Sequence, residues 1–202
     1  MKINDLVKCS DFPCRDTRQS GYLVPAVEID PAAVKILLIS EVAPANPADY
    51  YYAGADALFA NTTLLAFQEA GAQVACMQDI LDLGVYLTTA VKCAKTGPGL
   101  TTATVQQCSF LLEKELALFP NVKVYLLMGD VAIKAVNFIA KRNQEPRVIP
   151  AGSTYKLRGG KFTFRGVRAL PSYVQAGSAF FVEKIKRKTI AEDIAMALTL
   201  AG

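Results

Sequence analysis

Short, continuous apolar runs alternate along this chain with stretches whose apolar residues recur at helical spacing. The runs predict buried strands at 35–40, 73–77, 85–92 and 122–128, and a further extended segment at 167–170 that leads into Pro171-Ser172-Tyr173. Helices are predicted at 58–70, from 101–104 to near Pro120, from Gly129 to about 140, and from Phe180 onward. We therefore expect an α/β fold of three layers, α/β/α, around a central, mostly parallel four-stranded sheet.

Two further segments complete the expected organisation. Residues 1–34 are predicted to form an arm of loop or helix, because Pro25 and Pro31 interrupt regular structure. Residues 155–157 and 161–164 flank Arg-Gly-Gly, which is typical of a hairpin turn. No repeat, low-complexity tract or linker divides the chain, so residues 1–202 are expected to form one domain.

Composition fits a globular protein. The 202 residues are 52% hydrophobic, which is enough for a full core. No apolar run approaches the ~20 residues of a membrane span, and the first residues contain no secretory segment. We expect a soluble, cytoplasmic protein, monomeric and without membrane contact, in which cysteines stay reduced.

Four of the five cysteines form two pairs along the sequence. Cys9 and Cys14 have four residues between them, and Cys93 and Cys108 have fourteen. Cys93 follows the strand at 85–92, and Cys108 lies on the helix after a Gly/Pro loop. Four thiolates suit an iron–sulfur cluster or a tetrahedral zinc ion, and the chain has no histidine to act as an alternative ligand. Cys76, in the apolar run Gln-Val-Ala-Cys-Met, is expected to lie in the core.

The net charge of +4 is unevenly distributed. No acidic residue occurs from 146 to 182, whereas six basic ones do: Arg147, Lys156, Arg158, Lys161, Arg165 and Arg168. Another basic cluster contains Lys184, Lys186, Arg187 and Lys188. Such stretches suit a phosphate backbone, and a solvated basic face is the alternative.

Ligand sites of parallel sheets lie beyond the carboxyl ends of the strands. Three loops are predicted to meet there: 41–54, 93–104 and 170–177.

The segment Thr-Thr-Ala-Val-Lys-Cys at 88–93, the Gly/Pro loop after it and Cys-Ser-Phe-Leu-Leu-Glu-Lys-Glu-Leu at 108–116 resemble the iron–sulfur branch of the uracil-DNA glycosylase superfamily. The resemblance covers most of the chain. It implies a DNA partner, a flipped nucleotide whose N-glycosidic bond is hydrolysed, and a structural 4Fe-4S cluster on Cys9, Cys14, Cys93 and Cys108, with zinc as the alternative.

The resemblance also implies where the base binds. The family's first motif stands here as Glu41-Val42-Ala43-Pro44-Ala45, and Ala43 cannot position a water molecule. Asn46 and Asp49, which follow the proline, are our preferred candidates for that task, ahead of Glu41, although both are common turn residues. Phe59 is predicted to stack on the base, with core packing as the alternative.

Two positions depart from the family pattern. Thr89 stands where the family has the asparagine that reads the uracil edge, so specificity for uracil is open. Leu170 replaces the histidine of the His-Pro-Ser motif. The loop that follows is still predicted to contact a DNA phosphate through Ser172 and Tyr173, with Lys156 and Arg158 nearby, and Tyr173 or Gln175 is a candidate donor to the departing base.

Three hypotheses follow from these residues. The first is a DNA glycosylase of base-excision repair that removes a uracil-type or other deaminated base. The second is a catalytically inactive Fe-S DNA-binding member of the same superfamily. The third is an unrelated α/β enzyme that binds a small phosphorylated ligand.

Overall fold

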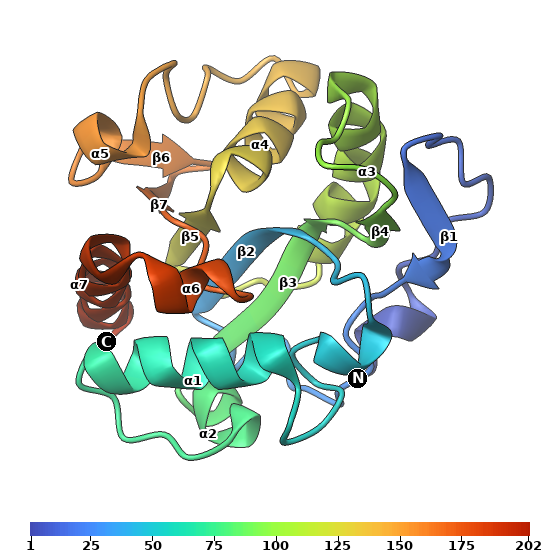
Figure 1. Cartoon of the computed structure of the whole chain (residues 1–202). Helices are drawn as coiled ribbons and strands as arrows, with labels where there is room; N and C mark the ends of the chain where they lie inside the picture. Colours follow the sequence, from blue (N-terminus) through green and yellow to red (C-terminus); the bar gives the residue numbers. More distant parts are fainter.

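A five-stranded sheet forms the centre of the computed structural model, which describes residues 1–202 (Figure 1). The strand order is β3 (Val85–Val91), β2 (Ile36–Val42), β5 (Val124–Met128), β7 (Val167–Ser172) and β6 (Phe162–Phe164). The first four strands are parallel and β6 is antiparallel to β7. The expected mostly parallel α/β sheet is confirmed, with β6 as an additional edge strand.

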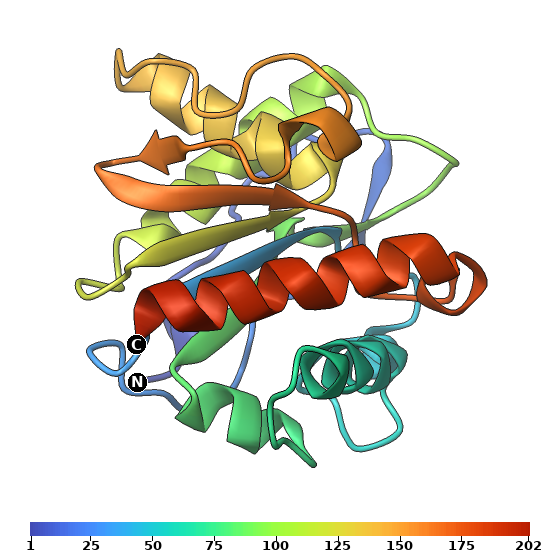
Figure 2. The same cartoon turned by 90° about the vertical axis from the view of Figure 1, so that its left-hand side faces the viewer.

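Helices cover both faces of the sheet (Figure 2). On one face, α3 (Thr102–Leu116) and α4 (Asp130–Arg142) pack on alternate strand residues such as Leu37 and Leu127. On the other, α1 (Leu58–Glu69), α2 (Met77–Asp82) and α7 (Lys184–Ala201) pack on the intervening residues, such as Leu38 and Leu126. Because successive side chains of a strand point to opposite faces, one strand supplies both cores. The three-layer arrangement is therefore the one expected.

Several short elements surround these layers. They are η1 (Ile3–Asp5), η2 (Pro47–Asp49), α5 (Thr154–Leu157) and α6 (Ala179–Val182). The expected N-terminal arm contains a strand, β1 (Thr17–Tyr22), that pairs antiparallel with β4 (Cys93–Lys95) in a separate small sheet. This pairing joins the arm to the segment directly after β3.

The loop that follows β2 protects the free edge of β3. The hydroxyl of Tyr52 lies 3.0 Å from the amide nitrogen of Leu87 and 3.4 Å from its carbonyl oxygen. An exposed strand edge presents such backbone groups for pairing with another chain. Tyr52 occupies them, and this anchors the loop against the edge strand.

Two predictions about secondary structure were wrong. Residues 73–77 form no strand, because Cys76 is instead the N-cap of α2, where Asp79 accepts hydrogen bonds from the amides of Ala75 and Cys76. Cys76 is consequently exposed and is not part of the core.

The expected hairpin about Arg-Gly-Gly is also absent. Residues 154–157 form α5, and β6 pairs instead with β7 across Arg165 and Gly166. Both turn residues have positive φ, 52° and 74°. A two-residue turn with positive φ at both positions matches the twist of the paired strands. The hairpin turn is therefore at 165–166 and not at the predicted Arg-Gly-Gly, 158–160.

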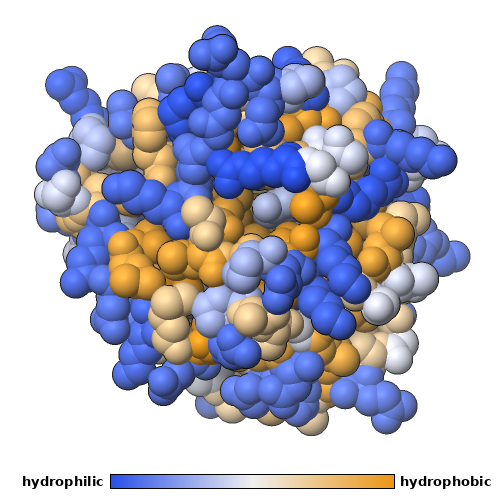
Figure 3. Space-filling view, turned by 180° about the vertical axis from the view of Figure 1, so that it is seen from behind, coloured by the Kyte–Doolittle hydropathy of each residue, from blue (hydrophilic) through white to orange (hydrophobic).

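Polar and apolar side chains are interspersed on the rear surface (Figure 3). Hydrophobic side chains gather near the middle of this view, with hydrophilic ones around them. None of the helices has both the length and the apolar character needed to span a membrane.

Candidate active site and thiol cavity

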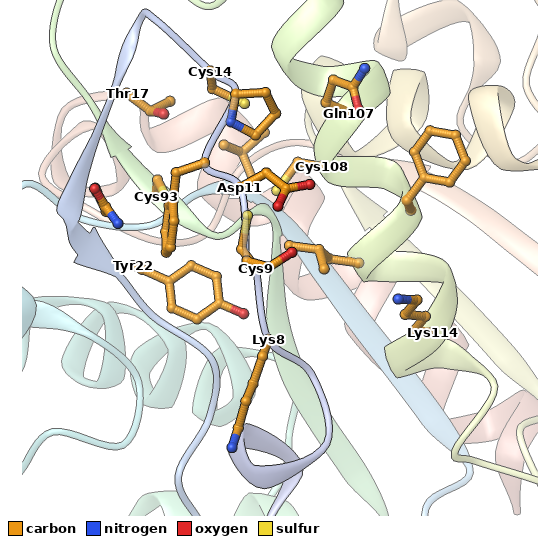
Figure 4. A pocket seen from close by; sticks show the side chains of 17 residues that line it. Lys8, Cys9, Asp11, Cys14, Thr17, Tyr22, Cys93, Gln107, Cys108 and Lys114 are labelled. Carbon is orange, nitrogen blue, oxygen red and sulfur yellow. The ribbon is translucent and has the colours of Figure 1, made fainter.

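Four cysteines line one cavity of about 440 Å³ between the N-terminal arm, β4 and α3 (Figure 4). Cys9 and Cys14 come from the arm, Cys93 begins β4, and Cys108 lies on α3. Segments far apart in sequence thus meet at the place where the cysteine spacing predicted a shared site. We call this space the thiol cavity.

Backbone pairing and one carboxylate hold the arm over the cavity. Tyr22 of β1 is in register with Cys93 of β4. Asp16 accepts a hydrogen bond of 2.6 Å from the amide of Thr101, the N-cap of α3, and another from the hydroxyl of Thr104. Asp16 thereby ties the arm to the first turn of the helix that carries Cys108.

Phe12, between the two arm cysteines, has a φ of 43°, which is unusual for a bulky residue. Its ring packs edge-on against Tyr22, with 5.4 Å between centroids. Tyr22 in turn donates a hydrogen bond of 2.8 Å to the carbonyl of Val7. The surrounding contacts keep this strained residue in place, and strain of this kind concentrates at functional sites.

The environment of the thiols favours their protonated form. Burial, with a smaller contribution from the neighbouring thiols, raises the pKa of Cys93 to about 12 and that of Cys108 to about 11. The backbone N–H of Lys92 donates to Cys108 Sγ over 3.2 Å, which opposes the rise. A cation that binds here must therefore displace protons and would itself stabilise the thiolates.

The donor set fits a thiolate-bound metal centre. All four candidate ligands are sulfur atoms, and soft thiolates select zinc and iron–sulfur centres. The residues present suit the cofactor that the sequence predicted, and its identity stays a prediction.

A second cluster of polar side chains lies at the carboxyl ends of the strands, on the α1 side of the sheet. The Ser40 hydroxyl lies 2.6 Å from the Tyr51 hydroxyl, and the Gln175 amide nitrogen donates to Tyr51 over 3.1 Å. Ser40 is the register partner of Thr89 on β3. We call these four residues the strand-end site. Of the three loops predicted to meet, 41–54 supplies Tyr51 and 170–177 supplies Gln175, whereas 93–104 begins with Cys93 at the thiol cavity.

Unpartnered polar atoms concentrate around the strand-end site. Five buried side-chain polar atoms in the chain have no hydrogen-bond partner. Two belong to the strand-end site: Thr89 Oγ1 and Gln175 Oε1. Buried polar groups are nearly always paired, so an unpaired group calls for an explanation such as a ligand or water molecule.

The predicted stacking residue, Phe59, lies beside this cluster. Its ring is half-buried, and the centroids of the Phe59 and Tyr51 rings are 5.4 Å apart. Gly177 also lies next to this ring, since a Cβ added to the glycine would be 3.7 Å from Phe59 Cε1. Ala43 and Pro44 are buried, and the Ala43 amide donates to the carbonyl of Val91 over 3.0 Å. The loop that contains the first motif is therefore hydrogen-bonded to the end of β3 at the point where it leaves β2.

The three candidates for positioning water lie in different settings. Asn46 is exposed and accepts a hydrogen bond from the Ala48 amide as N-cap of η2, which is the turn role considered as its alternative. Asp49 is half-buried in the same short helix. Glu41, at the end of β2, accepts a 3.1 Å hydrogen bond from the Val131 amide at the start of α4. Burial, followed by the charge of Asp130, raises the pKa of Glu41.

Ser172 and Arg158, both predicted to contact DNA phosphates, meet inside the protein instead. The buried Ser172 hydroxyl donates to Asp193 Oδ2 over 2.6 Å, and Arg158 lies 2.9 Å from both Asp193 Oδ1 and Glu192. Burial raises the pKa of Asp193, and the hydrogen bonds from Ser172 and Arg158 oppose that rise. These two side chains are committed to α7 in this structure.

Other basic side chains of the 146–182 stretch also have partners. Arg165 forms a 2.6 Å ion pair with Glu113 of α3, and Arg168 donates to the carbonyl of Gly160. Lys156 is exposed, and Tyr173 is half-buried with the Lys186 ammonium 5.3 Å from its ring centroid. The acidic partners come from helices outside the stretch, so its charge is partly neutralised.

Ser40 and Tyr51 belong to the strand-end site, and Thr63 lies beside it, although the sequence did not single them out. A polar residue that ends an apolar strand, as Ser40 ends Ile-Leu-Leu-Ile-Ser, was the available signal. Nothing in Tyr50-Tyr51-Tyr52 distinguished the tyrosine that points into the site from its neighbours. The sequence indicated Gln175 only as a candidate donor.

The fold and the strand-end site define an α/β protein with its binding groups at the carboxyl edge of a parallel sheet. The family model described as the uracil DNA glycosylase superfamily matches residues 27–191, so the chain belongs to that superfamily. The predicted resemblance is confirmed. Cys93 and Cys108 lie within the matched residues, whereas Cys9 and Cys14 precede them.

The chain is also similar in sequence to a curated relative. It is the type-5 uracil-DNA glycosylase of Thermus thermophilus, 30% identical over 126 residues. The alignment covers 61% of this chain and 54% of the relative, so the chain matches about half of that protein's length.

Proposed function

We propose that this protein is a DNA glycosylase that hydrolyses the N-glycosidic bond of a flipped, deaminated base. The observation that carries the proposal is the group of unpartnered polar atoms at the strand-end site, beside the ring of Phe59. A base that enters an active site needs an aromatic surface to stack on and polar atoms to pair with its edge. Membership of the superfamily and the similarity to a uracil-DNA glycosylase support this reading.

The residues divide the chemical work. Phe59 stacks on the base, and the free hydroxyl of Thr89 pairs with its edge. Asp49 or Asn46 places the water molecule that attacks the sugar, and Asp49 is preferred because the Asn46 oxygen already caps η2. Ala43 and Pro44 form the wall of the loop.

The DNA-facing surface lies where the strand-end site meets α6 and the start of α7. Lys184 and Lys188 are exposed there, next to exposed apolar side chains, namely Phe181, Val182 and Ile185. Exposed apolar residues beside basic ones suit proteins that contact phosphates and insert side chains between base steps. Lys156 and Tyr173 extend this surface.

The thiol cavity is proposed to hold a 4Fe-4S cluster on Cys9, Cys14, Cys93 and Cys108, with zinc at the same residues as the alternative. The centre would fasten the arm to β4 and α3 and supply no redox step, since hydrolysis transfers no electrons. Its effect on DNA would be indirect, through the segment that leads from Cys93 back to Thr89.

The second candidate function is an inactive DNA-binding member of the superfamily. Leu170 favours it: this residue stands at the position of the motif histidine and is 2% exposed in the core, where it supplies no proton. In an active enzyme, the departing base would instead depend on a donor from the loop after β7.

Single-turnover cleavage distinguishes the two. Oligonucleotides that carry uracil, hypoxanthine or xanthine are incubated with excess metal-loaded protein, and abasic sites are revealed by alkaline scission. An active enzyme cuts at least one of them, and Asp49→Asn or Asn46→Ala slows the cut by about 10²–10⁴-fold, whichever residue places the water. Absence of cutting, with DNA binding retained, would favour the inactive member.

A further inference from the structure

The buried amide of Gln175 has one engaged end and one free end. Its side chain is 0% exposed in the loop after β7. Nε2 lies 3.1 Å from the Tyr51 hydroxyl and 3.5 Å from Thr63 Oγ1, whereas Oε1 has no partner. An acceptor that is fully buried and unpaired is unfavourable unless something else pairs with it.

A chain of hydrogen bonds fixes which end is free. The Ser40 hydroxyl reaches the carbonyl of Thr88, which can only accept, so Ser40 donates there. Ser40 must therefore accept from the Tyr51 hydroxyl, and the Tyr51 oxygen must accept from Gln175. Only the NH₂ end of an amide donates, so this end faces Tyr51 and the carbonyl oxygen is left free.

The free oxygen belongs to the strand-end site. Tyr51 connects the amide to Ser40, whose register partner on β3 is Thr89. The Thr89 hydroxyl also lacks a partner, and Phe59 packs on Tyr51. One free acceptor and one free hydroxyl are thus held at the place where the proposed function puts the base.

A hydrogen-bond acceptor that cannot donate favours bases whose edge presents a ring N–H over bases whose ring nitrogen is unprotonated. Uracil at N3, and hypoxanthine and xanthine at N1, carry a ring N–H next to a carbonyl. Cytosine and adenine have a bare ring nitrogen at the same place, which accepts. If cytosine or adenine binds, its ring nitrogen and Gln175 Oε1 are both acceptors, so the buried oxygen stays unpaired. A site built around a hydrogen bond strongly rejects a ligand that cannot form it.

We propose that Gln175 is a specificity-determining residue, which reads the ring N–H of a deaminated base through Oε1 and is held in that orientation by Tyr51. The proposal rests on the proposed function. Thymine and guanine share the ring N–H, so the amide discriminates against cytosine and adenine only.

The test measures binding alone, so it does not depend on catalysis. Metal-loaded protein is titrated against duplexes that differ at one nucleotide, 2′-fluoro-2′-deoxyuridine or 2′-fluoro-2′-deoxycytidine, whose electron-poor sugars resist hydrolysis. Wild type should bind the uracil duplex at least about tenfold more tightly than the cytosine duplex. Gln175→Leu should bring the ratio close to one.

Two further variants separate reading from folding. Tyr51→Phe keeps the ring and releases the amide to rotate, so the ratio should fall although the Gln175 side chain remains. Thr63→Val removes only the 3.5 Å contact and should leave the ratio as in wild type.

A wild-type preference that survives in Gln175→Leu and Tyr51→Phe would overturn the role of Gln175 and leave the proposed function intact. Equal binding of both duplexes by wild type would overturn the reading of the base edge and would weigh against the proposed function as well.

Discussion

Lys92 and Glu115 form an ion pair in which both side chains are wholly buried. The Lys92 ammonium also donates to Thr88 Oγ1 over 2.7 Å and to the carbonyl of Thr89 over 2.6 Å. Glu115 accepts from the Tyr86 hydroxyl over 2.7 Å. This network joins α3 to the end of β3, and Lys92 lies in the segment between Thr89 of the strand-end site and Cys93 of the thiol cavity.

Removing one partner of this pair should destabilise the protein strongly. Glu115→Leu leaves a buried ammonium without its counter-charge, and such changes cost about 3–5 kcal/mol. The double variant Lys92→Met/Glu115→Leu should recover most of that loss, because neither charge remains. Denaturant unfolding of wild type, the single variant and the double variant under anaerobic conditions measures the free energy of unfolding. A decrease of less than about 1 kcal/mol for Glu115→Leu would contradict the prediction that the Lys92 ammonium depends on Glu115 as its buried counter-charge.

Metal content tests the thiol cavity. Protein purified without oxygen should be brown, with about four irons per chain. Cys93→Ser or Cys108→Ser should lose the iron and the colour, whereas Cys76→Ser, which changes an exposed thiol outside the cavity, should keep both. Colourless protein with one zinc ion would establish the alternative centre.

Acid should weaken the network around Glu113. Burial opposes the shift, but hydrogen bonds from Asn143 and Arg142 and the charges of Arg142 and Arg165 lower the pKa of Glu113. A lowered pKa in the folded state stabilises the protein above the unfolded-state value, about 4.3, and this contribution disappears as the pH falls through the folded-state pKa.

Glu113→Gln should therefore lose less stability than wild type between pH 6 and pH 3. The difference should be at most about 1 kcal/mol, since these groups are partly exposed, and it should shrink at high salt. Thermal unfolding across that pH range measures it, and identical pH profiles would contradict the assignment.

Two basic residues that look alike in the sequence should behave differently in DNA binding. Lys156 is exposed, so Lys156→Ala should reduce the slope of log affinity against log salt by about 0.9, the value for one phosphate contact. Arg158 is paired with Asp193 and Glu192, so Arg158→Ala should lower stability and leave the slope largely unchanged. The reverse pattern would mean that Arg158 leaves α7 when DNA binds.

The sequence predicted most of the fold because the decisive signals are local. A continuous apolar run such as Ile-Leu-Leu-Ile at 36–39 is buried on both faces of the sheet, so it indicates a strand even when its pairing partners are unknown. One failure occurred where a short apolar run competes with helix capping, because Asp79 caps α2 and residues 73–77 lead into that helix. The spacing of Cys93 and Cys108 predicted one half of the thiol cavity, since α3 is the next element after β4, and the pairing of β1 with β4 adds Cys9 and Cys14.

The strand-end site was less predictable because its geometry depends on contacts distant in sequence. Gln175 meets Tyr51 across 124 residues, and Arg158 meets Asp193 across 35. The sequence of a basic stretch indicates its positive charges, but it does not indicate which acidic residues of other helices will pair with them. Thr89 and Phe59 were predicted from the family resemblance, which places its motif positions beside the strand at 85–92 and the helix at 58–70.

Release of a free base is the measurement that decides whether the protein is a glycosylase. Excess metal-loaded protein is mixed with duplexes that each contain a single uracil, hypoxanthine or xanthine, and the liberated base is identified and quantified by mass spectrometry, with a matched cytosine duplex as control. The proposed function predicts about one equivalent of free base from at least one of the three duplexes, none from the cytosine duplex, and a much slower release by Asp49→Asn or Asn46→Ala. Tight, salt-sensitive binding of the uracil, hypoxanthine and xanthine duplexes without release of any base would contradict it and identify an inactive DNA-binding protein.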